Sequence, residues 1–279
     1  MSAVPKSQGP VLLREDGDGI CTLTMNRPRQ LNLLTSEMLA ALQREFDSLI
    51  SDQKARVVIL AGAGKGFCAG HDLKEIRALN EPPKIKALVG QCSRMMQTIP
   101  ALPQPVIARV QGAAAAAGCQ LVAQCDLAVA SEAASFATSG VTWGCFCSTP
   151  GVAVGRNLQR KHALEMLPTG EPISAARGLE WGLVNKVVPR KELDRAVMEL
   201  AKTLAAKPRP QWLRASAPST NRWNLASSRL TRSPRVCSAR ALRTRKGAPA
   251  WMPSSRSDRR RSTEGKALFR LARLRSYRP

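Results

Sequence analysis

The chain has 279 residues, and lysine plus arginine outnumber aspartate plus glutamate 43 to 20. The excess is uneven, because residues 1–210 hold 25 basic and 18 acidic side chains, whereas residues 211–279 hold 18 basic and 2 acidic ones. The basic character therefore belongs mainly to the last quarter of the sequence, and the overall charge does not by itself indicate a nucleic-acid-binding protein.

Several classes of protein and site are not expected from the composition. No apolar run approaches the ~20 residues that a membrane-spanning helix requires. The eight cysteines lie mostly in apolar runs, none is paired at C-x-x-C spacing, and there are only two histidines, so we expect buried free thiols and no metal site. The first ten residues show neither the apolar core of a secretory signal nor an arginine-rich presequence.

The first half of the chain alternates between short apolar runs and helical patterns. Residues 19–25 alternate between apolar and polar side chains, which predicts a half-buried strand that ends at Asn26-Arg27-Pro28. Thr35 or Ser36 can cap a helix whose apolar face is predicted to be Met38, Leu39, Leu42, Phe46, Leu49 and Ile50. A second strand over 56–61, a flexible glycine-rich turn over 62–66 and a helix over 84–99 are predicted next.

The second half continues the same alternation. The predicted elements are a strand at 106–107, a helix from 118, strands at 126–130 and 135–138, helical segments near 150 and at 163–167, a helix capped by Ser174, a strand within 182–189 and a helix over 191–206. After about Lys207 the pattern stops, because residues 211–279 are rich in arginine, serine and proline without a period of 2 or 3.6.

The stretch from Gln104 to Asp126 has the residues of a strand that passes to a helix through glycine and five consecutive alanines. Small residues at such a transition allow a ligand to approach the backbone, and the free N–H groups of the helix start favour negative charge. An oxyanion hole needs this geometry. The same composition also suits a plain helix-packing seam, and the stretch alone does not decide between the two.

A second motif shifts the interpretation toward the oxyanion hole. Residues 67–75 read FCAGHDLKE and residues 111–121 read QGAAAAAGCQL, with Asn26-Arg27-Pro28 upstream. In this order and spacing they resemble the two oxyanion-hole segments of the crotonase, or enoyl-CoA hydratase/isomerase, superfamily. The resemblance extends from about Ile20 to about Lys207. It implies an α/β fold built as a crotonase-like spiral of ββα units.

The resemblance also divides the chain and suggests its partners. We expect a flexible N-terminus over 1–10, an acyl-CoA-binding domain over 11–207 and a basic, low-complexity tail over 208–279 without stable structure. The implied ligand is a coenzyme A thioester, as substrate or bound molecule, with no other cofactor. The family's role in fatty-acid metabolism and the mitochondrial location of such relatives are further expectations.

Site residues follow position by position from the family's pattern. The oxyanion donors would be the backbone N–H groups of His71 and Ala117, which would hold the thioester carbonyl and stabilise an enolate. Each donor of this kind is typically worth ~3 kcal/mol of barrier. The residues expected to contact the coenzyme A moiety are Arg27, Asp72, Leu73 and Lys74.

The two glutamates with which hydratases orient water have no counterpart here. Gln120 occupies the first position and Gly140 the second, while the position that supplies an aspartate in dienoyl-CoA isomerases falls near Ser148. A glutamine can orient water but cannot exchange a proton at neutral pH. Because general acid–base catalysis usually contributes ~10²–10⁴-fold, conventional hydration is expected to be weak or absent.

Other groups could still supply chemistry, and the sequence leaves them as alternatives. The His71 imidazole could act as a general base, although no carboxylate partner is evident and Asp72 suits a capping role. Glu75 and Glu132 fit solvated surface positions. A thiol at Cys145 or Cys147 could act as a nucleophile if a base lay beside it. An active hydratase or isomerase with another base is thus the second reading of function.

The tail raises two further hypotheses. A shifted reading frame or an alternative exon would explain why resemblance and periodicity end together near Arg209, and a transcript encoding the family's usual ending in the same frame would contradict this. Clustered arginines could bind nucleic acid or another acidic surface, although the tryptophans are scattered and no folded reader motif is present. The family's homotrimer uses helices that this tail does not resemble, so the oligomeric state stays open.

Overall fold

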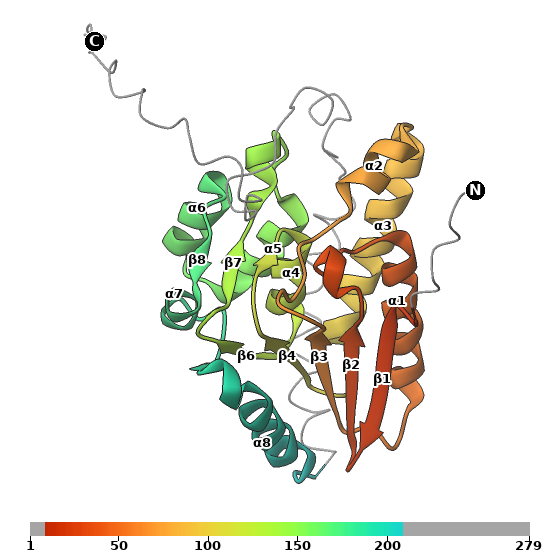
Figure 1. The fold of residues 1–279 in the computed structure, drawn as a ribbon, viewed down its shortest axis with the longest axis vertical. Coiled ribbons are helices and arrows are strands. Elements are labelled where there is room, and N and C mark those ends of the chain that lie inside the picture. Colours follow the sequence, from red (N-terminus) through yellow and green to blue (C-terminus); the bar gives the residue numbers. More distant parts are fainter. Residues whose placement is uncertain (1–8, 209–279) are drawn as a thin grey trace, which may run out of the picture. The chain divides into compact units, whose positions relative to one another are not determined.

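The larger of two sheets forms the base on which the candidate site is built (Figure 1). The computed structural model of the chain describes residues 9–208. The strand order is β1 (Leu12–Gly17), β2 (Ile20–Met25), β3 (Val57–Gly62), β4 (Val106–Val110), β6 (Leu127–Ser131) and β9 (Lys186–Val188). Only the β1–β2 pair is antiparallel, and the other neighbours are parallel. The edge strand β1 was not predicted, because its solvent-facing LLREDG sequence lacks an apolar alternation.

A smaller sheet runs above the ends of the larger one and contains β5 (Ala114–Ala115), β7 (Ser135–Ala137) and β8 (Ile173–Ser174). Two isolated parallel bridges, Leu34 with His71 and Cys68 with Ala114, extend it across the earlier units. The chain therefore passes from the large sheet to the small sheet and then into a helix, several times in succession. This confirms the predicted spiral of ββα units.

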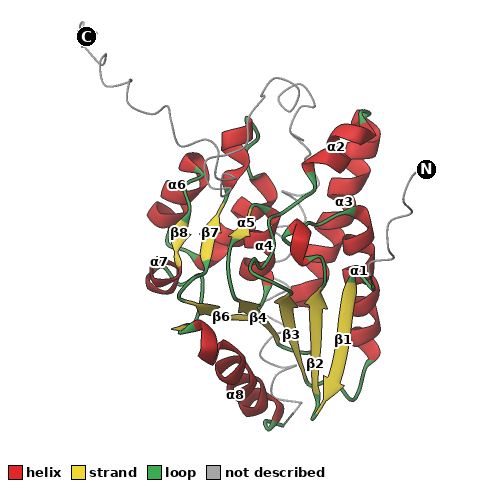
Figure 2. Cartoon of the chain, viewed as in Figure 1, coloured by secondary structure: helices red, strands yellow, loops and turns green. Residues whose placement is uncertain are grey.

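Eight helices of the described residues cover the sheets (Figure 2). They are α1 (Ser36–Ser51), α2 (Leu73–Leu79), α3 (Pro82–Thr98), α4 (Ala117–Gln124), α5 (Ser148–Asn157), α6 (Arg160–Thr169), α7 (Ala175–Glu180) and α8 (Leu193–Ala205). The helix α2 was not predicted, because its short LKEIRAL sequence buries only Ile76. Within residues 9–208, no helix combines the length and the apolar character that crossing a bilayer demands.

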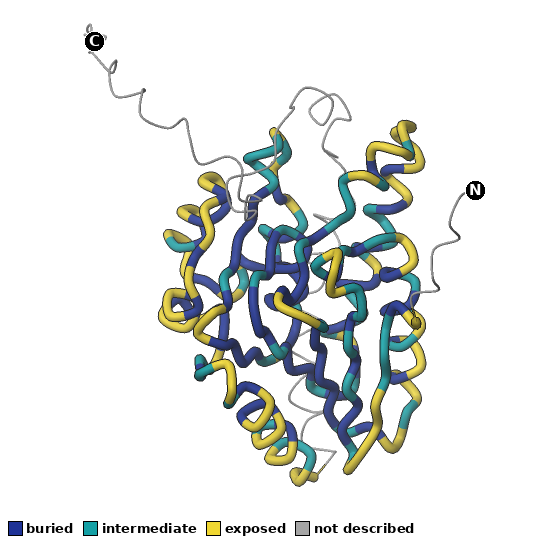
Figure 3. The backbone as a smooth tube through the Cα atoms, viewed as in Figure 1, coloured by how far each residue is buried: buried dark blue, intermediate teal, exposed yellow. Residues whose placement is uncertain are grey.

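Side chains on alternate positions of β3 point to two different cores, as the period of a strand requires. Val58 and Leu60 join the main core with α1, α3 and α4, whereas Val57 and Ile59 pack on the other face against α8. The central strands are buried and the helices expose their outer faces (Figure 3). One prediction for α1 is wrong, because Ile50 is 52% exposed while its neighbour Leu49 fills the apolar face.

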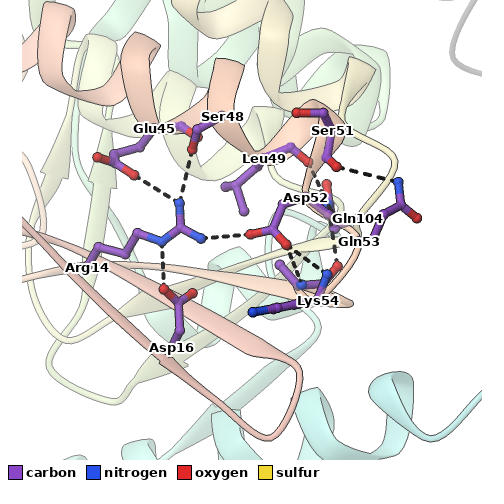
Figure 4. A network of polar contacts seen from close by, with 11 residues as sticks. Arg14, Asp16, Glu45, Ser48, Leu49, Ser51, Asp52, Gln53, Lys54 and Gln104 are labelled. Atoms are coloured by element: carbon purple, nitrogen blue, oxygen red, sulfur yellow. Dashed lines mark hydrogen bonds and ion pairs between the residues drawn. The ribbon is translucent and has the colours of Figure 1, made fainter.

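Polar contacts fix both ends of α1. The Thr35 hydroxyl accepts a hydrogen bond from the Met38 N–H, as predicted for a capping residue. On β1, the Arg14 guanidinium donates to Glu45, Ser48 and Asp52 near the end of α1 and to Asp16 beside it (Figure 4). The hydrogen bond from Arg14 is the main reason that the pKa of Asp16 lies below its usual value.

The terminal segments fall outside the described residues, which end at residue 208. The predictions for residues 1–8, for the basic tail from 209 onward, for its origin and for its binding to nucleic acid therefore lie outside this part of the chain.

Two helical glycines provide a matched test of the packing. A Cβ added at Gly118 would lie 2.0 Å from the Cys68 carbonyl oxygen, whereas one added at Gly155 would meet nothing within 4 Å. We expect Gly155→Ala to raise the free energy of unfolding by about 0.5–1 kcal/mol, because alanine favours helix over glycine. Gly118→Ala should lower it by about 1–3 kcal/mol or more through overpacking. Urea denaturation of both variants measures the difference, and equal effects would contradict the close approach at Gly118.

Candidate functional site

Two segments from neighbouring units lie against each other where the small sheet meets the helices. Cys68, in the loop after β3, donates its N–H to the Ala113 carbonyl at 3.2 Å and accepts from the Ala115 N–H at 2.9 Å. A Cβ added at Gly70 would lie 3.3 Å from the Ala117 nitrogen. The structure thus brings together the two segments that carry the predicted donors.

The backbone geometry at His71 directs its N–H away from the neighbouring unit. The Gly70 carbonyl accepts from the Leu34 N–H at 2.8 Å. Because the peptide bond is planar and trans, the His71 N–H points opposite to the Gly70 carbonyl, away from Leu34. At the other segment, Ala117 is the first residue of α4, where helical N–H groups have no partner within the helix. Neither N–H donates to an acceptor within residues 9–208.

Ala116, just before the second donor, has an unusual backbone conformation with φ +50° and ψ −116°. Its N–H donates to the Ala137 carbonyl at 2.8 Å and its carbonyl accepts from the Gln120 N–H at 3.1 Å. The hydrogen bond to the Ala116 carbonyl fixes the peptide group between Ala116 and Ala117, and so the direction of the Ala117 N–H, which points opposite to that carbonyl. A positive φ at a residue with a Cβ costs free energy, which the surrounding contacts must offset.

Two buried amides that the sequence analysis missed hold the loop between β3 and His71. The Asn32 side-chain amide donates to the carbonyls of Ala63, Gly66 and Phe67 at 3.0–3.1 Å. The Gln111 amide donates to the carbonyls at positions 62, 64 and 66, two of them at 2.7 Å. Together the two amides bind five carbonyls, those of residues 62, 63, 64, 66 and 67. The prediction of a flexible turn over 62–66 is therefore wrong.

A signal for these two residues is present in the sequence but is weak. Asn32 lies between leucines and Gln111 lies between a strand and a run of small residues. Both are almost fully buried. A polar amide in such a setting must find hydrogen-bond partners, although the sequence does not show which ones.

The His71 side chain is poorly suited to act as a base. Its Nε2 is buried and has no hydrogen-bond partner among the described residues. Desolvation lowers the pKa of the imidazole to about 4, against a smaller opposing effect from Glu75. The ring is therefore neutral and weakly basic at pH 7, which favours the use of His71 through its backbone.

The carboxylates after His71 serve as helix caps. Asp72 accepts from the Lys74 and Glu75 N–H groups at the start of α2, which agrees with the capping role considered for it. Glu75 accepts from the Ser36 N–H at 3.1 Å and from the Ser36 hydroxyl. Glu75 keeps a partly exposed surface position, as predicted, and it also joins α2 to the start of α1. Glu132 is exposed, as predicted.

Arg27 and Asp72 line the same surface hollow, of about 380 Å³, together with Gln30, Thr35, Ser36, Glu37 and Glu75. The Arg27 guanidinium donates to the carbonyls of Gly9, Pro10 and Asn26, and Glu37 lies 3.7 Å from it. The lining carries three carboxylates and one guanidinium that is already hydrogen-bonded. The hollow itself therefore does not favour a phosphate group.

The two positions that were predicted to replace the hydratase glutamates differ in how much space surrounds them. Gln120, on α4, is buried and its Oε1 has no hydrogen-bond partner among the described residues. A Cβ added at Gly140 would lie 2.4 Å from the Cys145 carbonyl oxygen and 2.7 Å from the Cys147 sulfur. No larger side chain fits at Gly140 without movement of the backbone at residues 145–147.

Cys147 shows no sign of an activated thiol. Burial raises its pKa, although the Gly140 N–H donates to its sulfur at 3.2 Å and partly opposes that effect. A raised pKa keeps the thiol protonated at neutral pH, and the thiolate is the nucleophilic form. The geometry does not support Cys147 as a nucleophile.

Known protein families and relatives match most of this chain. The model of the enoyl-CoA hydratase/isomerase family matches residues 15–223, which extends past Lys207. The human mitochondrial enoyl-CoA hydratase domain-containing protein 3 is 47% identical over 193 residues, or 69% of this chain and 64% of that protein. The rat protein of the same name is 43% identical over 204 residues, or 73% and 68%. The chain thus spans about two thirds of the length of these relatives.

Solved structures agree with the fold. An enoyl-CoA hydratase from Mycobacterium smegmatis is 46% identical, with a TM-score of 0.73 over 81% of this chain and 92% of that one. The crystal structure of the human enoyl-CoA hydratase domain-containing protein 3 gives a TM-score of 0.71 at 41% identity, over 78% and 90% of the two chains.

The strain at Ala116 can be measured directly. Ala116→Gly should raise the free energy of unfolding by about 1 kcal/mol, because glycine adopts a positive φ without steric cost. Ala114→Gly is the control, since Ala114 lies in the ordinary strand β5 and its replacement should be destabilising. Equal destabilisation of the two variants in urea denaturation would show that Ala116 is not strained.

The buried imidazole predicts a dependence of stability on pH. The unfolded chain protonates His71 near pH 6.5, whereas the folded chain does so only near its lowered pKa of about 4. The unfolded state therefore binds more protons between these values, and His71 should cost up to about 3 kcal/mol of stability as the pH falls from 7 to 4. Denaturation of wild type and His71→Asn across this range isolates the effect. Parallel stability curves would rule it out.

Proposed function

The chain belongs to the enoyl-CoA hydratase/isomerase family, and on that basis we propose that it binds an acyl-coenzyme A thioester without carrying out conventional hydration. In this proposal the thioester carbonyl lies between the backbone N–H groups of His71 and Ala117. The acyl chain passes Gln120, and no carboxylate stands at the positions of the hydratase glutamates.

The observation that carries the proposal is the pair of N–H groups left without acceptors where two segments meet. Buried N–H groups are almost always hydrogen-bonded, so two free donors at one place fit a ligand oxygen. The Ala117 N–H also lies at the start of α4, where the helix dipole favours a developing negative charge. Each such donor typically stabilises an oxyanion by ~3 kcal/mol.

The lack of conventional hydration rests on the groups around these donors. Gln120 cannot exchange a proton at neutral pH. Gly140 has no side chain and no room for one. The His71 imidazole has a pKa of about 4 and a buried Nε2, so it does not replace the missing base.

Contacts to the coenzyme A moiety are proposed for the same edge of the fold. Lys74 lies in the first turn of α2 with an exposed side chain, where its ammonium can meet a phosphate from solvent. Leu73 and Asp72 precede it and Arg27 lies across the hollow, although Arg27 and Asp72 already have structural hydrogen bonds. We place the ligand above α2 rather than inside the acidic hollow.

The cellular setting is proposed from the relatives. Proteins 43–47% identical to this chain are named as mitochondrial, so we propose that it acts in mitochondria, on acyl-CoA of fatty-acid metabolism. The family's homotrimer remains a prediction.

A ligand that lacks the carbonyl oxygen tests the proposal without altering the protein. Butyryl-CoA should bind measurably, and S-butyl-CoA, a thioether with no carbonyl, should bind at least about tenfold more weakly because it loses two hydrogen bonds. Isothermal titration calorimetry measures both affinities. Infrared difference spectroscopy should show the bound thioester carbonyl shifted to lower frequency, which reports its hydrogen bonds directly.

Different failures point to different parts of the proposal. Equal binding of thioester and thioether would contradict the role of His71 and Ala117. In a parallel titration with 2-butenoyl-CoA, sustained heat with formation of the hydrated product would show that another group supplies the proton. Saturable heat that returns to baseline is the expected result.

A further inference from the structure

Asn32 uses both ends of its side-chain amide to join two segments of the candidate site. Its Oδ1 accepts a hydrogen bond from the Arg27 N–H at 2.9 Å, and its Nδ2 donates to the carbonyls of residues 63, 66 and 67 at 3.0–3.1 Å. The residue is fully buried, so water does not compete for these hydrogen bonds. The amide therefore ties the turn that contains Arg27 to the loop that leads to His71.

The backbone on either side of this amide holds the rest of the loop. The Leu31 carbonyl accepts from the Ala69 N–H at 3.0 Å, and the Leu34 N–H donates to the Gly70 carbonyl at 2.8 Å. The Gly70 carbonyl and the His71 N–H belong to one planar peptide group, so a rotation of the carbonyl redirects the N–H. The segment thus fixes the direction of the first proposed oxyanion donor.

An asparagine suits this position because the backbone is left-handed there. Leu31 and Asn32 have φ of +51° and +53°, in the region that asparagine adopts more readily than most residues with a Cβ. Their N–H groups donate to the carbonyls of Pro28 and Arg27, at 3.2 and 3.0 Å respectively, and so close a tight reversal of the chain. The reversal brings the amide and the backbone groups on both sides of it to the same loop.

Gln111 binds the same loop but is placed differently. Its Nε2 donates to the carbonyls of residues 62, 64 and 66, at the start of the loop, while its Oε1 has no hydrogen-bond partner among the described residues. Asn32 reaches residue 67, which is closer in sequence to His71, and both ends of its amide are bonded. The position of the donor should therefore depend more on Asn32.

We propose that Asn32 is a positioning residue for the thioester carbonyl. Because it is fully buried, it acts through the loop and not by contact with the ligand. Its amide holds the loop so that the His71 N–H points at the carbonyl oxygen before a ligand binds. Such preorganisation matters because a hydrogen bond weakens steeply once its angle is lost. This inference rests on the proposed function, since it states how one of the two proposed donors is held.

A change from amide to acid at this position tests the proposal. Asn32→Asp removes the N–H groups and keeps the size, the acceptor for the Arg27 N–H and the tolerance of a positive φ. The affinity ratio of butyryl-CoA to S-butyl-CoA, at least about tenfold in the wild-type protein, should fall to about two or less, with the affinity for S-butyl-CoA changed less than about twofold. Calorimetry measures both affinities. In infrared difference spectra the bound thioester carbonyl should return toward its frequency in the free ligand, which a merely structural role would not cause.

Gln104→Glu is the matched control, because it makes the same change in another buried amide. The Gln104 Nε2 donates to the carbonyls of residues 49, 52 and 55 around the end of α1, and the residue is 2% exposed. Both variants should lose stability in urea denaturation, since each leaves three carbonyls without their donor. Only Asn32→Asp should change the affinity ratio and the carbonyl frequency.

Hydrogen exchange of the wild-type protein gives a test that does not depend on a variant. If the loop is held in advance, the Ala69 N–H should exchange slowly in the free protein, and saturating butyryl-CoA should change its rate less than about threefold. The His71 and Ala117 N–H groups should be protected at least about tenfold by the ligand, because they gain the carbonyl as an acceptor.

Each outcome bears on the positioning role or on both proposals. Asn32→Gly, which adopts a positive φ without cost, repeats the ligand comparison if Asn32→Asp does not fold. A wild-type affinity ratio in a folded Asn32 variant overturns the positioning role and leaves the acyl-CoA site intact. An equal fall of the ratio in Gln104→Glu also overturns it, as does strong protection of the Ala69 N–H by the ligand. If the wild-type protein binds neither ligand, or binds both equally, the proposed function fails and the positioning role fails with it.

Discussion

The candidate site depends on hydrogen bonds from two buried side-chain amides to the loop that follows β3. In this loop the hydrogen bonds to the carbonyls of residues 62, 66 and 67 are buried, where water does not replace them. Asn32 and Gln111 donate to these carbonyls and share the one at Gly66. A carbonyl left unpaired in this setting would cost roughly 1–3 kcal/mol, which explains why amides lie in otherwise apolar surroundings. The fixed loop then continues directly into Cys68, Gly70 and His71.

The two oxyanion donors occupy related places in successive units of the fold. In each unit the chain leaves the large sheet, adds a short piece to the small sheet and begins a helix. His71 lies just before α2 in one unit, and Ala117 begins α4 in the next. Contacts between the small-sheet pieces, such as the bridge from Cys68 to Ala114, bring together the two segments that carry these N–H groups. The pairing of donors is therefore a consequence of the repeated topology.

Much of this arrangement could be predicted from the sequence, because it rests on local patterns. The strands β2, β3, β4 and β6 have apolar runs of the right length, and Thr35 and Ser174 are recognisable caps. The motifs at 67–75 and 111–121 indicated two segments that the structure brings into contact. The contacts that hold the site could not be predicted, because they join residues far apart in sequence. The carbonyls to which the Asn32 amide donates lie more than thirty positions away, and Glu75 reaches back to Ser36.

Predictions from local sequence pattern also failed at positions where tertiary contacts outweigh that pattern. A glycine-rich turn such as 62–66 is free to move when its backbone faces solvent, but here its carbonyls are bonded to buried amides. Ile50 continues the apolar spacing of α1, yet it is exposed to solvent. A positive φ at Ala116 is contrary to the preference of alanine, and only the bonds of its neighbours in space impose it.

The crowding at Gly140 also limits how this lineage can change. Gly140, which was predicted to stand at the position of a hydratase glutamate, is closed in by the Cys145 carbonyl and the Cys147 sulfur. A single substitution to glutamate would meet this backbone before it could reach a ligand. A carboxylate at this position therefore requires residues 145–147 to be reshaped first, and a designer who wishes to introduce one must begin with this segment.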